Sequence, residues 1–398
     1  MKLLRGLDLV RGLFAVLSAL GLAAFFSRAN AAIQLSQDGY HVFAGDKIQD
    51  ALELAARNTT NKIVKVHAGE YRPDSKRQAL IWFNKEHDGI RLEAAGPVTL
   101  TAANPELSSP SDPGFPAVVN HVVYFGDGVS SNTVIKGFRL TGANSFLTRE
   151  GTREMEPNAT IAKNFFFFAD GGAIKIFGRS YPAIQNLEVV DNFTSPCGAG
   201  ISVQHQGFNQ SWVLIENCVF LRNRTQVTGA AIDLLAGSAA RILNCLFVGN
   251  VSNTGTDVVA KNSGERPFVN SGVVTIFQNS RAEVGHCTFT GNRNGVDDMG
   301  GASIYTDCIF FDNKLESGLK GLPRYELAVN GGVKEVSGCF INGVVHDVGH
   351  LVSFEKNMLK APDPKFDTHF VPASADYKNA GYRPDYSATT PLRISVPQ

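Results

Sequence analysis

A few polar residues near the middle of the chain have side chains that could do chemistry. Lys175 could act as a general base, while Asp233 could supply negative charge or a Ca²⁺ ligand, and His205 lies between them in the sequence. Proton abstraction next to the carboxylate of a uronate needs a base and a cation that stabilises the enolate. We therefore treat Lys175, Asp233 and His205 as candidate catalytic residues of a polysaccharide lyase, with Ca²⁺ as a possible cofactor.

These residues belong to short segments in which apolar and polar positions alternate. If the apolar positions face inward, their neighbours face outward. The expected outward rows are Lys175, Ser202, Asp233 and Thr275, then Phe177, Gln204, Leu235 and Phe277. Aromatic faces can stack on sugar rings, and amides and charges bind hydroxyl groups. The candidate substrate-binding residues are Ser202, Gln204, Phe177, Phe277 and Arg179. The alternative is that Lys175 and Asp233 are solvated surface residues without a chemical role.

Other catalytic patterns are weak. Asp297 and Asp298 are the only adjacent acidic pair, and hydrolysis of a glycosidic bond needs two carboxylates about 5 to 10 Å apart. Because the pair follows Asn294-Gly295, we expect a turn there. His286 is expected to be structural, and no zinc-ligand spacing, phosphate loop or nucleophile elbow is present.

A motif that returns every 20 to 40 residues must position these side chains. Its four copies are Asn217-Cys218-x-Phe220-x-x-Asn223, Asn244-Cys245-x-Phe247-x-x-Asn250, His286-Cys287-x-Phe289-x-x-Asn292 and Asp307-Cys308-x-Phe310-x-x-Asn313. The apolar positions alternate with the period of a strand, and regular short strands indicate a solenoid. The pattern predicts a parallel β-helix in which like residues stack on like.

Stacking predicts the environment of each motif residue. Strands of successive coils lie about 4.8 Å apart, so the Cys and Phe side chains should form inner files. The Asn amides should donate to one neighbour and accept from the other. Parallel cysteine side chains are too far apart for good disulfide geometry, so we expect free, buried thiols. Cys197 lies outside this file, and its state is left open.

The composition and the terminal segments indicate the class of partner, the cellular location and the domain boundaries. The chain has 37 basic and 37 acidic residues, which argues against a nucleic-acid partner. Residues 1–31 resemble a secretory signal, with an uncleaved anchor as the alternative, and nothing later is long and apolar enough for a membrane span. We expect a secreted, periplasmic or cell-surface protein, with a β-helix over 32–350 and a C-terminal cap or tail over 351–398.

A capping element is expected before the coils. Asp46-Lys47-Ile48-Gln49 suggests a capping box, followed by a helix with Ile48, Ala51, Leu52 and Ala55 on one face and a strand at 63–67. The segment from Ala44 to Pro73 resembles the opening of exported right-handed β-helix proteins of the pectin-lyase-like superfamily, and residues 361–384 resemble their closing segment. This resemblance implies a right-handed helix and covers most of residues 39–385.

A second motif opens each regular coil. Its copies are Gly171-Gly172-Ala173-Ile174, Gly198-Ala199-Gly200-Ile201, Gly229-Ala230-Ala231-Ile232 and Gly300-Gly301-Ala302-Ser303. With the Phe-x-x-Asn motif, it resembles the repeats of chlamydial polymorphic outer-membrane proteins, although this chain has no C-terminal barrel like theirs. Long inserts at 143–169, 251–270 and 314–335 could form a wall beside a groove.

The sequence thus predicts an all-β, right-handed parallel β-helix of nine or ten coils with an N-terminal capping helix. We expect it to bind or cleave an extracellular polysaccharide, with a uronate-polymer lyase as one form of this function. The alternative is a non-catalytic surface, adhesion or structural β-helix protein. The sequence leaves the polymer and the oligomeric state open.

Overall fold

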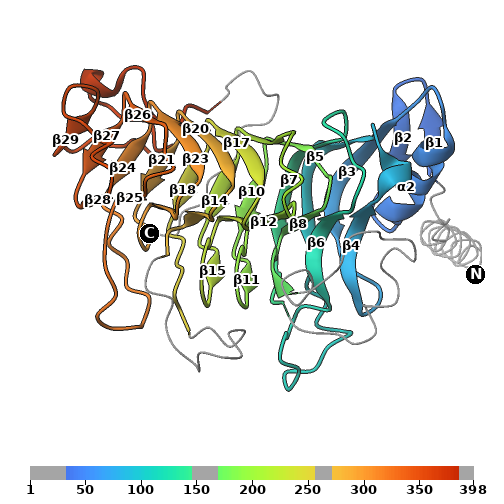
Figure 1. Cartoon of the computed structure of the whole chain (residues 1–398). Helices are drawn as coiled ribbons and strands as arrows, with labels where there is room; N and C mark the ends of the chain where they lie inside the picture. The colour runs from blue at the N-terminus through green and yellow to red at the C-terminus, as the bar shows by residue number, and fades with distance from the viewer. Residues whose placement is uncertain (1–32, 146–168, 256–270, 385–398) are drawn as a thin grey trace, which may run out of the picture.

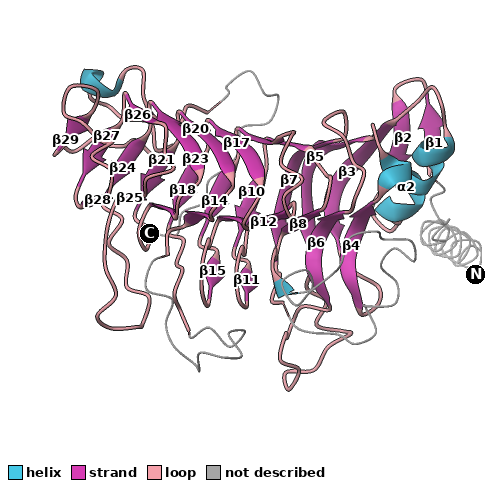
Figure 2. Cartoon of the chain, viewed as in Figure 1, coloured by secondary structure: helices cyan, strands magenta, loops and turns pink. Residues whose placement is uncertain are grey.

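The computed structural model describes residues 33–145, 169–255 and 271–384, and these form a parallel solenoid of strands (Figures 1 and 2). One face is a nine-stranded parallel sheet, which corresponds to nine coils. In coil order its strands are β4 (Arg77–Phe83), β6 (Val119–Phe125), β8 (Ile174–Phe177), β12 (Ile201–Gln204), β16 (Ile232–Leu234), β19 (Val274–Ile276), β22 (Val296–Asp298), β25 (Leu327–Val329) and β28 (Val345–Asp347). The all-β parallel solenoid and the expected number of coils are confirmed.

The opposite wall divides into two stacks of strands. It begins with β2 (Gly39–Val42), β3 (Ile63–Tyr71), β5 (Arg91–Thr101) and β7 (Val134–Thr141). The two ends of β7 pair with β9 (Ala183–Gln185) and β10 (Glu188–Val190), so one long strand gives way to two short ones. The first stack continues through β13 (Val213–Glu216), β17 (Ala239–Leu243), β20 (Arg281–Gly285), β23 (Ala302–Thr306) and β26 (Glu335–Ser337). The second continues through β14 (Val219–Leu221), β18 (Leu246–Val248), β21 (Thr288–Thr290), β24 (Ile309–Phe311), β27 (Phe340–Asn342) and β29 (Met358–Leu359).

The inner files of the solenoid are those that the motif predicts. The rings of Phe220, Phe247, Phe289 and Phe310 stack with centroid distances of 5.0, 4.5 and 4.8 Å. The motif cysteines are all free and buried, and strand register places each beside its counterpart in the next coil. The predicted thiol file is confirmed. Sulfur and rings fill a narrow core that water does not enter.

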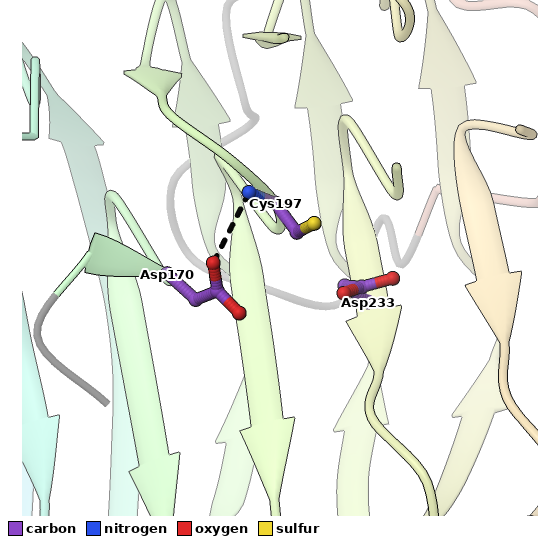
Figure 3. A group of neighbouring side chains, drawn as sticks. All are labelled: Asp170, Cys197 and Asp233. Atoms are coloured by element: carbon purple, nitrogen blue, oxygen red, sulfur yellow. Dashed lines mark hydrogen bonds between the residues drawn. The ribbon is translucent and has the colours of Figure 1, made fainter. Parts of the chain in front are cut away.

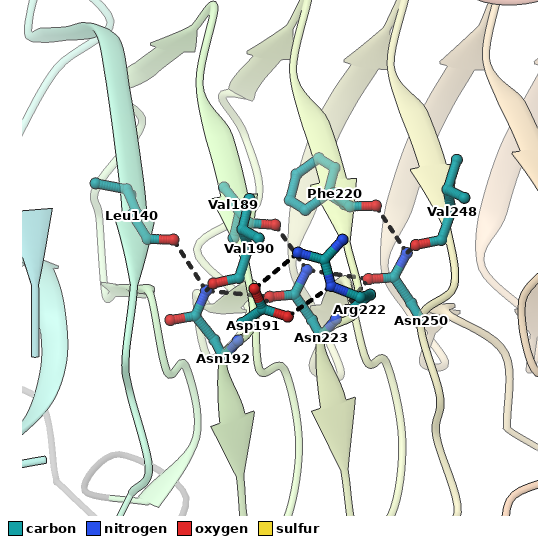
Figure 4. A network of polar contacts seen from close by, with 10 residues as sticks. All are labelled: Leu140, Val189, Val190, Asp191, Asn192, Phe220, Arg222, Asn223, Val248 and Asn250. Atoms are coloured by element: carbon teal, nitrogen blue, oxygen red, sulfur yellow. Dashed lines mark hydrogen bonds and ion pairs between the residues drawn. The ribbon is translucent and has the colours of Figure 1, made fainter. Parts of the chain in front are cut away.

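The predicted asparagine ladder is also confirmed (Figure 4). Each Nδ2 donates to the Oδ1 of the next coil, at 3.0 Å from Asn192 to Asn223 and 3.0 Å from Asn223 to Asn250. The chain of amides continues through Asn292 to Asn313. There, Asn313 donates to both carboxylate oxygens of the buried Glu326, which ends the ladder. Every ladder amide therefore has a partner in the dry interior.

The residue before each motif cysteine adopts a left-handed conformation, and so does Asn186 before Leu187, at the equivalent position of the preceding coil. Asn186, Asn217, Asn244, His286 and Asp307 all have φ between 49° and 54°. Asn and Asp tolerate this conformation better than most residues. His286 shares the turn with its counterparts, which agrees with the structural role expected for it.

The N-terminal cap is the helix α2 (Ile48–Arg57), next to an antiparallel pair formed by β1 (Gln34–Ser36) and β2. The four residues expected on its buried face are buried, as predicted. The predicted capping box is wrong, because Lys47 is the N-cap and makes no side-chain capping bond. Asp46 instead accepts a hydrogen bond from the Phe43 N–H at 2.9 Å, which stabilises the turn before the helix.

The C-terminal segment folds back along the solenoid. Tyr382 packs on Val219, Leu221 and Leu246, whose side chains point outward from β14 and β18. Asn244 and Arg383 exchange two hydrogen bonds of 2.7 Å, which anchor the segment. The apolar outward positions of these strands are thus covered by the chain itself.

Three sequence-based expectations lie wholly or partly outside the described residues: the N-terminal signal, the insert at 143–169 and the insert at 251–270. The third insert, at 314–335, includes the connection from β24 to β25 and continues past that strand. Over the described ranges, we find no helix with the length and apolar character needed to cross a bilayer.

Candidate functional site

The predicted outward row exists, and strand pairing defines it. Lys175 on β8 pairs with Ser202 on β12, which pairs with Asp233 on β16. The row continues to Thr275 on β19 and Asp297 on β22. The alternate residues, including Ile174, Ile201 and Ile232, lie in the core as expected. The prediction that this row is exposed is wrong, because all its members are at most 1% exposed.

The chain before each strand covers the row. The segment turns at Gly171, Gly198 and Gly229, which have φ of 87°, 69° and 62°. A Cβ on Gly198 would lie 2.8 Å from the Ser202 Cβ, and one on Gly229 would lie 2.6 Å from the Asp233 Cβ. The repeated glycine is therefore required for this close approach.

The turn brings a second row of polar residues over the first. Asp170, Cys197 and Thr228 each precede their outward residue by five positions in the sequence. They belong to the coils of β8, β12 and β16, and all are at most 4% exposed. We call Asp170, Lys175, Cys197, Thr228 and Asp233 the buried polar group.

Side chains from three coils meet at the middle one (Figure 3). A carboxylate oxygen of Asp170, the Cys197 sulfur and a carboxylate oxygen of Asp233 lie within 4.8 Å of one another. Asp170 Oδ1 accepts a hydrogen bond from the Cys197 N–H at 3.1 Å. The Thr228 hydroxyl lies 3.0 Å from the Cys197 sulfur and 3.3 Å from Asp233 Oδ1. Cys197 is thus the centre of the group.

Lys175 enters the group from the first coil. Its Nζ donates to the Ser202 hydroxyl at 3.2 Å. Because Ser202 and Cys197 are small, the middle coil has room for longer side chains from both neighbouring coils.

Burial shifts the protonation equilibria of the group. Loss of hydration lowers the pKa of Lys175 to about 8, although Asp170 and Asp233 act in the opposite direction. Burial and repulsion from Asp170 raise the pKa of Asp233 well above its ordinary value. Burial likewise raises the pKa of the Cys197 thiol. Burial therefore favours the neutral forms of Lys175, Asp233 and Cys197.

The three predicted catalytic side chains are buried in these surroundings. Lys175 and Asp233 are fully buried, so neither can contact a polymer in this structure. His205 is buried, and both its ring nitrogens contact the backbone, with Nε2 2.9 Å from the Ser180 carbonyl and Nδ1 accepting from the Ala239 N–H at 3.2 Å. Burial lowers the pKa of His205 to about 4, so the ring is neutral near pH 7 and has a structural role.

The predicted substrate-binding residues divide into covered and accessible ones. Ser202 and Gln204 are at most 5% exposed, and Phe177 is buried against Ala79 and Tyr124. These three side chains are therefore not accessible to a polymer in this structure. Phe277 is half-buried and Arg179 is exposed.

Asp297 and Asp298 differ from the sequence-based expectation as well. They lie in strand β22 and are buried, whereas we expected a turn. Asp298 accepts from the Tyr305 hydroxyl at 2.8 Å and from the N–H groups of Gly300 and Gly301. Neither carboxylate is accessible for hydrolysis of a polymer.

Arg179 and Phe277 belong to an accessible region where successive coils turn from the nine-stranded sheet to the next stack. The turns are residues 178–182, 205–212, 235–238 and 277–280. We define the arginine–aromatic corner by the charged and aromatic residues that contact one another here, which are Arg179, Tyr181, Phe208, Trp212, Arg241 and Arg281.

Trp212 is the centre of one half of the corner. Its ring centroid lies 4.3 Å from the Arg281 Cζ and 5.0 Å from the Arg241 Cζ. Trp212 and Arg281 come from coils that are two apart, with Ala239 as the paired residue of Arg281 between them. The small, buried Ala239 lets the ring and the guanidinium meet above it.

Phe208 is the centre of the other half. The Arg179 Cζ lies 5.3 Å from its ring centroid, and the Tyr181 hydroxyl donates to its carbonyl at 2.6 Å. Arg179 also forms a two-pronged ion pair with Asp127. These contacts hold the side chains in place at the surface.

The corner carries an excess of positive charge. Arg179 pairs with Asp127, and Arg241 pairs with Glu283 at 2.7 Å. Within the described ranges, Arg281 forms no ion pair, and its guanidinium contacts the Asn209 carbonyl and the Trp212 ring. An anionic group could therefore bind here without displacing a carboxylate from Arg281.

Sequence reasoning missed Trp212, which lies in a turn, and Arg241 and Arg281, which lie in the strands β17 and β20, because no repeated pattern marks these positions. It also left out Asp170 and Cys197 as site residues. The five-residue spacing from Asp170 to Lys175, from Cys197 to Ser202 and from Thr228 to Asp233 is a signal that could have found them.

Comparison with known proteins supports the fold. A family model of the right-handed β-helix region matches residues 120–271. Comparison with curated protein sequences gave no match. Among solved structures, the catalytic domain of a GH87 α-1,3-glucanase in complex with nigerose is 13% identical, covers 78% of this chain and 70% of its own, and has a TM-score of 0.28.

A PL6 family alginate lyase, AlyGC, is 10% identical, covers 86% of this chain and 56% of its own, and has a TM-score of 0.29. At these values, the similarity carries no information about a substrate. The family-model match and the parallel pairing of the nine-stranded sheet together show that this chain contains a right-handed parallel β-helix.

Proposed function

We propose that this chain is an exported β-helix protein that binds an acidic extracellular polysaccharide at the arginine–aromatic corner. The observation that carries the proposal is the set of guanidinium groups held against aromatic rings, in which Arg179 and Arg241 are exposed and the half-buried Arg281 lacks an ion-pair partner in the described structure. Export rests on the N-terminal sequence alone.

The chemistry of the corner suits a polymer of uronate sugars. Guanidinium groups bind carboxylates with two parallel hydrogen bonds, and stacking on a ring leaves their edges available for this. The aromatic rings provide flat apolar surface for the C–H faces of sugars. Because neighbouring coils repeat about every 4.8 Å, charges on successive turns can contact successive parts of one chain.

Binding without cleavage is the form of this function that the site supports. Lys175 was the candidate base for a lyase, and it is fully buried in this structure. The described part of the corner has arginines and a tyrosine but no exposed carboxylate pair.

The test is binding of alginate and polygalacturonate, with dextran as a neutral comparison, measured by affinity electrophoresis and calorimetry. We expect binding to the acidic polymers that weakens with added salt, because exposed charges are screened. Arg281→Ala should weaken binding about tenfold or more, since one charge-assisted hydrogen bond contributes about 1.5–3 kcal/mol. Arg72→Ala is the control for loss of one positive charge elsewhere on the surface, because Arg72 is exposed and pairs with Glu70 outside the arginine–aromatic corner.

Fluorescence provides a second readout at the corner. The chain has two tryptophans, Trp82 and Trp212, so Trp82→Phe leaves Trp212 as the only reporter. Its emission should change when an acidic polymer binds. Equal binding of dextran and alginate, or wild-type affinity in Arg281→Ala, would contradict the proposal. Absorbance from an unsaturated product would show cleavage, and would mean that binding alone is an incomplete description.

A further inference from the structure

Two histidine side chains lie in contact on the outer face of the first coils. His41 is on β2 and His67 is on the neighbouring strand β3, and the residues next to them along each strand point into the core. His41 Nδ1 lies 2.8 Å from His67 Nε2. The His41 side chain is 18% exposed and His67 is half-buried, so both are in part accessible from solvent.

Asp38 determines which nitrogen of His41 carries a hydrogen. Its Oδ1 lies 2.9 Å from His41 Nε2. Hydrogen bonds from Lys65, Ser36 and His41 lower the pKa of Asp38 below its ordinary value, so this carboxylate is ionised near pH 7 and only accepts hydrogen bonds. Nε2 of His41 therefore carries the hydrogen, and Nδ1 holds a lone pair beside His67. Metal-binding histidines commonly have a carboxylate on their other nitrogen, because it fixes the tautomer and the ring orientation.

Phe43 holds the second ring in place. Its centroid lies 4.2 Å from that of His67, and the two ring planes differ by 8°. The rings of His41 and His67 have centroids 5.1 Å apart and planes that differ by 27°. Stacking and the carboxylate thus orient both imidazoles in advance, which reduces the cost of ordering them around a ligand.

The fold does not require histidine at these positions. Strand register pairs His41 with Lys65, and it pairs His67 with Ala95 of the following coil. The outer face of these strands therefore accepts an ammonium group or a methyl group beside the two rings. Packing alone does not explain two imidazoles in contact, whereas a ligand shared between them does.

The distance between the two nitrogens indicates which ion fits. Two nitrogens that each lie about 2.0 Å from one ion are about 2.8 Å apart at a right angle and about 3.3 Å apart at the tetrahedral angle. The observed 2.8 Å matches the right angle, which is typical of Cu²⁺ and Ni²⁺. Of these two ions, Cu²⁺ binds nitrogen ligands more tightly. Calcium and magnesium prefer oxygen ligands.

We propose that His41 Nδ1 and His67 Nε2 bind a Cu²⁺ ion at the N-terminal end of the solenoid, where β2 and β3 lie side by side (Figure 1). The ion takes the place of the hydrogen between the rings, and water completes its coordination. That hydrogen moves to Nδ1 of His67, so both imidazoles remain neutral. His41 keeps its hydrogen bond to Asp38. The site is separate from the arginine–aromatic corner and does not depend on polysaccharide binding.

The first experiment titrates Cu²⁺ into the untagged, full-length protein and follows binding by calorimetry. We expect about one tight site per chain. Loss of an outer carboxylate partner weakens metal binding about 10–100-fold, so Asp38→Ala should weaken it about tenfold or more, and His41→Ala and His67→Ala about 100-fold or more. His369→Ala is the matched control, because His369 is an exposed histidine of the C-terminal segment. It should bind Cu²⁺ as tightly as the wild type.

The second experiment needs no variant to fold. Electron paramagnetic resonance of the wild-type protein with one equivalent of Cu²⁺ should show hyperfine coupling to two imidazole nitrogens. The coupling should fall to one nitrogen in His67→Ala with unchanged circular dichroism, and it should be unchanged in His369→Ala. A wild-type spectrum without imidazole coupling would overturn the proposal, as would equal Cu²⁺ affinity in the wild type and His67→Ala.

Discussion

Replacement of Asn250 by alanine tests the energetic role of the asparagine ladder. Asn250 is fully buried, and its Nδ2 donates to Asn292 Oδ1 at 3.0 Å and to the Phe220 carbonyl at 2.9 Å. Its Oδ1 accepts from the N–H and the Nδ2 of Asn223, both at 3.0 Å. Alanine removes these four bonds, and a fifth from Nδ2 to the Val248 carbonyl at 3.3 Å, at the centre of the ladder.

The structure sets the size of the expected loss. After the change, the Asn223 N–H and the Phe220 carbonyl lose these partners, while Asn223 Nδ2 retains its bond to the Val189 carbonyl at 2.8 Å. Each buried group left without a partner costs about 1–3 kcal/mol. We therefore expect the free energy of unfolding to fall by about 3–5 kcal/mol.

Urea unfolding followed by circular dichroism measures this change. Because a solenoid can unfold in stages, hydrogen exchange of residues 219–225 should be followed as well, and its protection should fall in the variant. Asn132→Ala is the control, because Asn132 is exposed and should cost less than about 0.5 kcal/mol. Asn250→Asp keeps the acceptor for Asn223 but loses the donor, so it should also be destabilising.

A loss below about 1 kcal/mol for Asn250→Ala, with unchanged exchange, would refute the reasoning. It would mean that the amides merely satisfy one another and that the stacked rings and thiols hold the coils together. The same result in both Asn250→Ala and Asn132→Ala would be the clearest contradiction.

Two further predictions concern the same core. Burial raises the pKa of Glu326 to about 7 from an ordinary 4.5, so its protonated form favours folding, and this contribution should be complete below pH 4.5 and lost as the pH rises through 7. The loss should be roughly 3 kcal/mol, and Glu326→Gln should remove this part of the pH dependence of unfolding measured in urea. Phe247→Ala removes a ring stacked between Phe220 and Phe289, and should lower the free energy of unfolding by about 3–5 kcal/mol, whereas Phe247→Leu should cost much less.

The sequence predicts the inner files well because they depend on a single physical rule. Residues in the same position of successive coils lie in contact, so one type that packs well with itself can be repeated. Cys218, Phe220 and Asn223 and their counterparts follow that rule, and their places in the core could be predicted from spacing alone.

The exposure of the outward row could not be predicted in the same way. Alternation says that Lys175 and Asp233 point away from the core, which is correct, but it does not say what lies above them. The covering segment depends on a turn at glycine, and the glycines could equally serve an open coil. The contact between Trp212 and Arg281 could not be predicted from a local sequence pattern either. It depends on the small size of Ala239 in the intervening coil.

The residue types in the outward row change along the solenoid, and they show that the fold does not require charged residues at this position. Before Lys175 the row holds Tyr124, and after Asp297 it holds Ala328, so the fold accepts an aromatic ring or a methyl group at this position. Replacement of buried ion pairs by apolar residues is often neutral or stabilising. Packing alone would therefore be served by apolar residues in the central coils too. Asp170, Lys175, Cys197 and Asp233 instead gather in three successive coils, so packing alone does not explain why these residue types lie there.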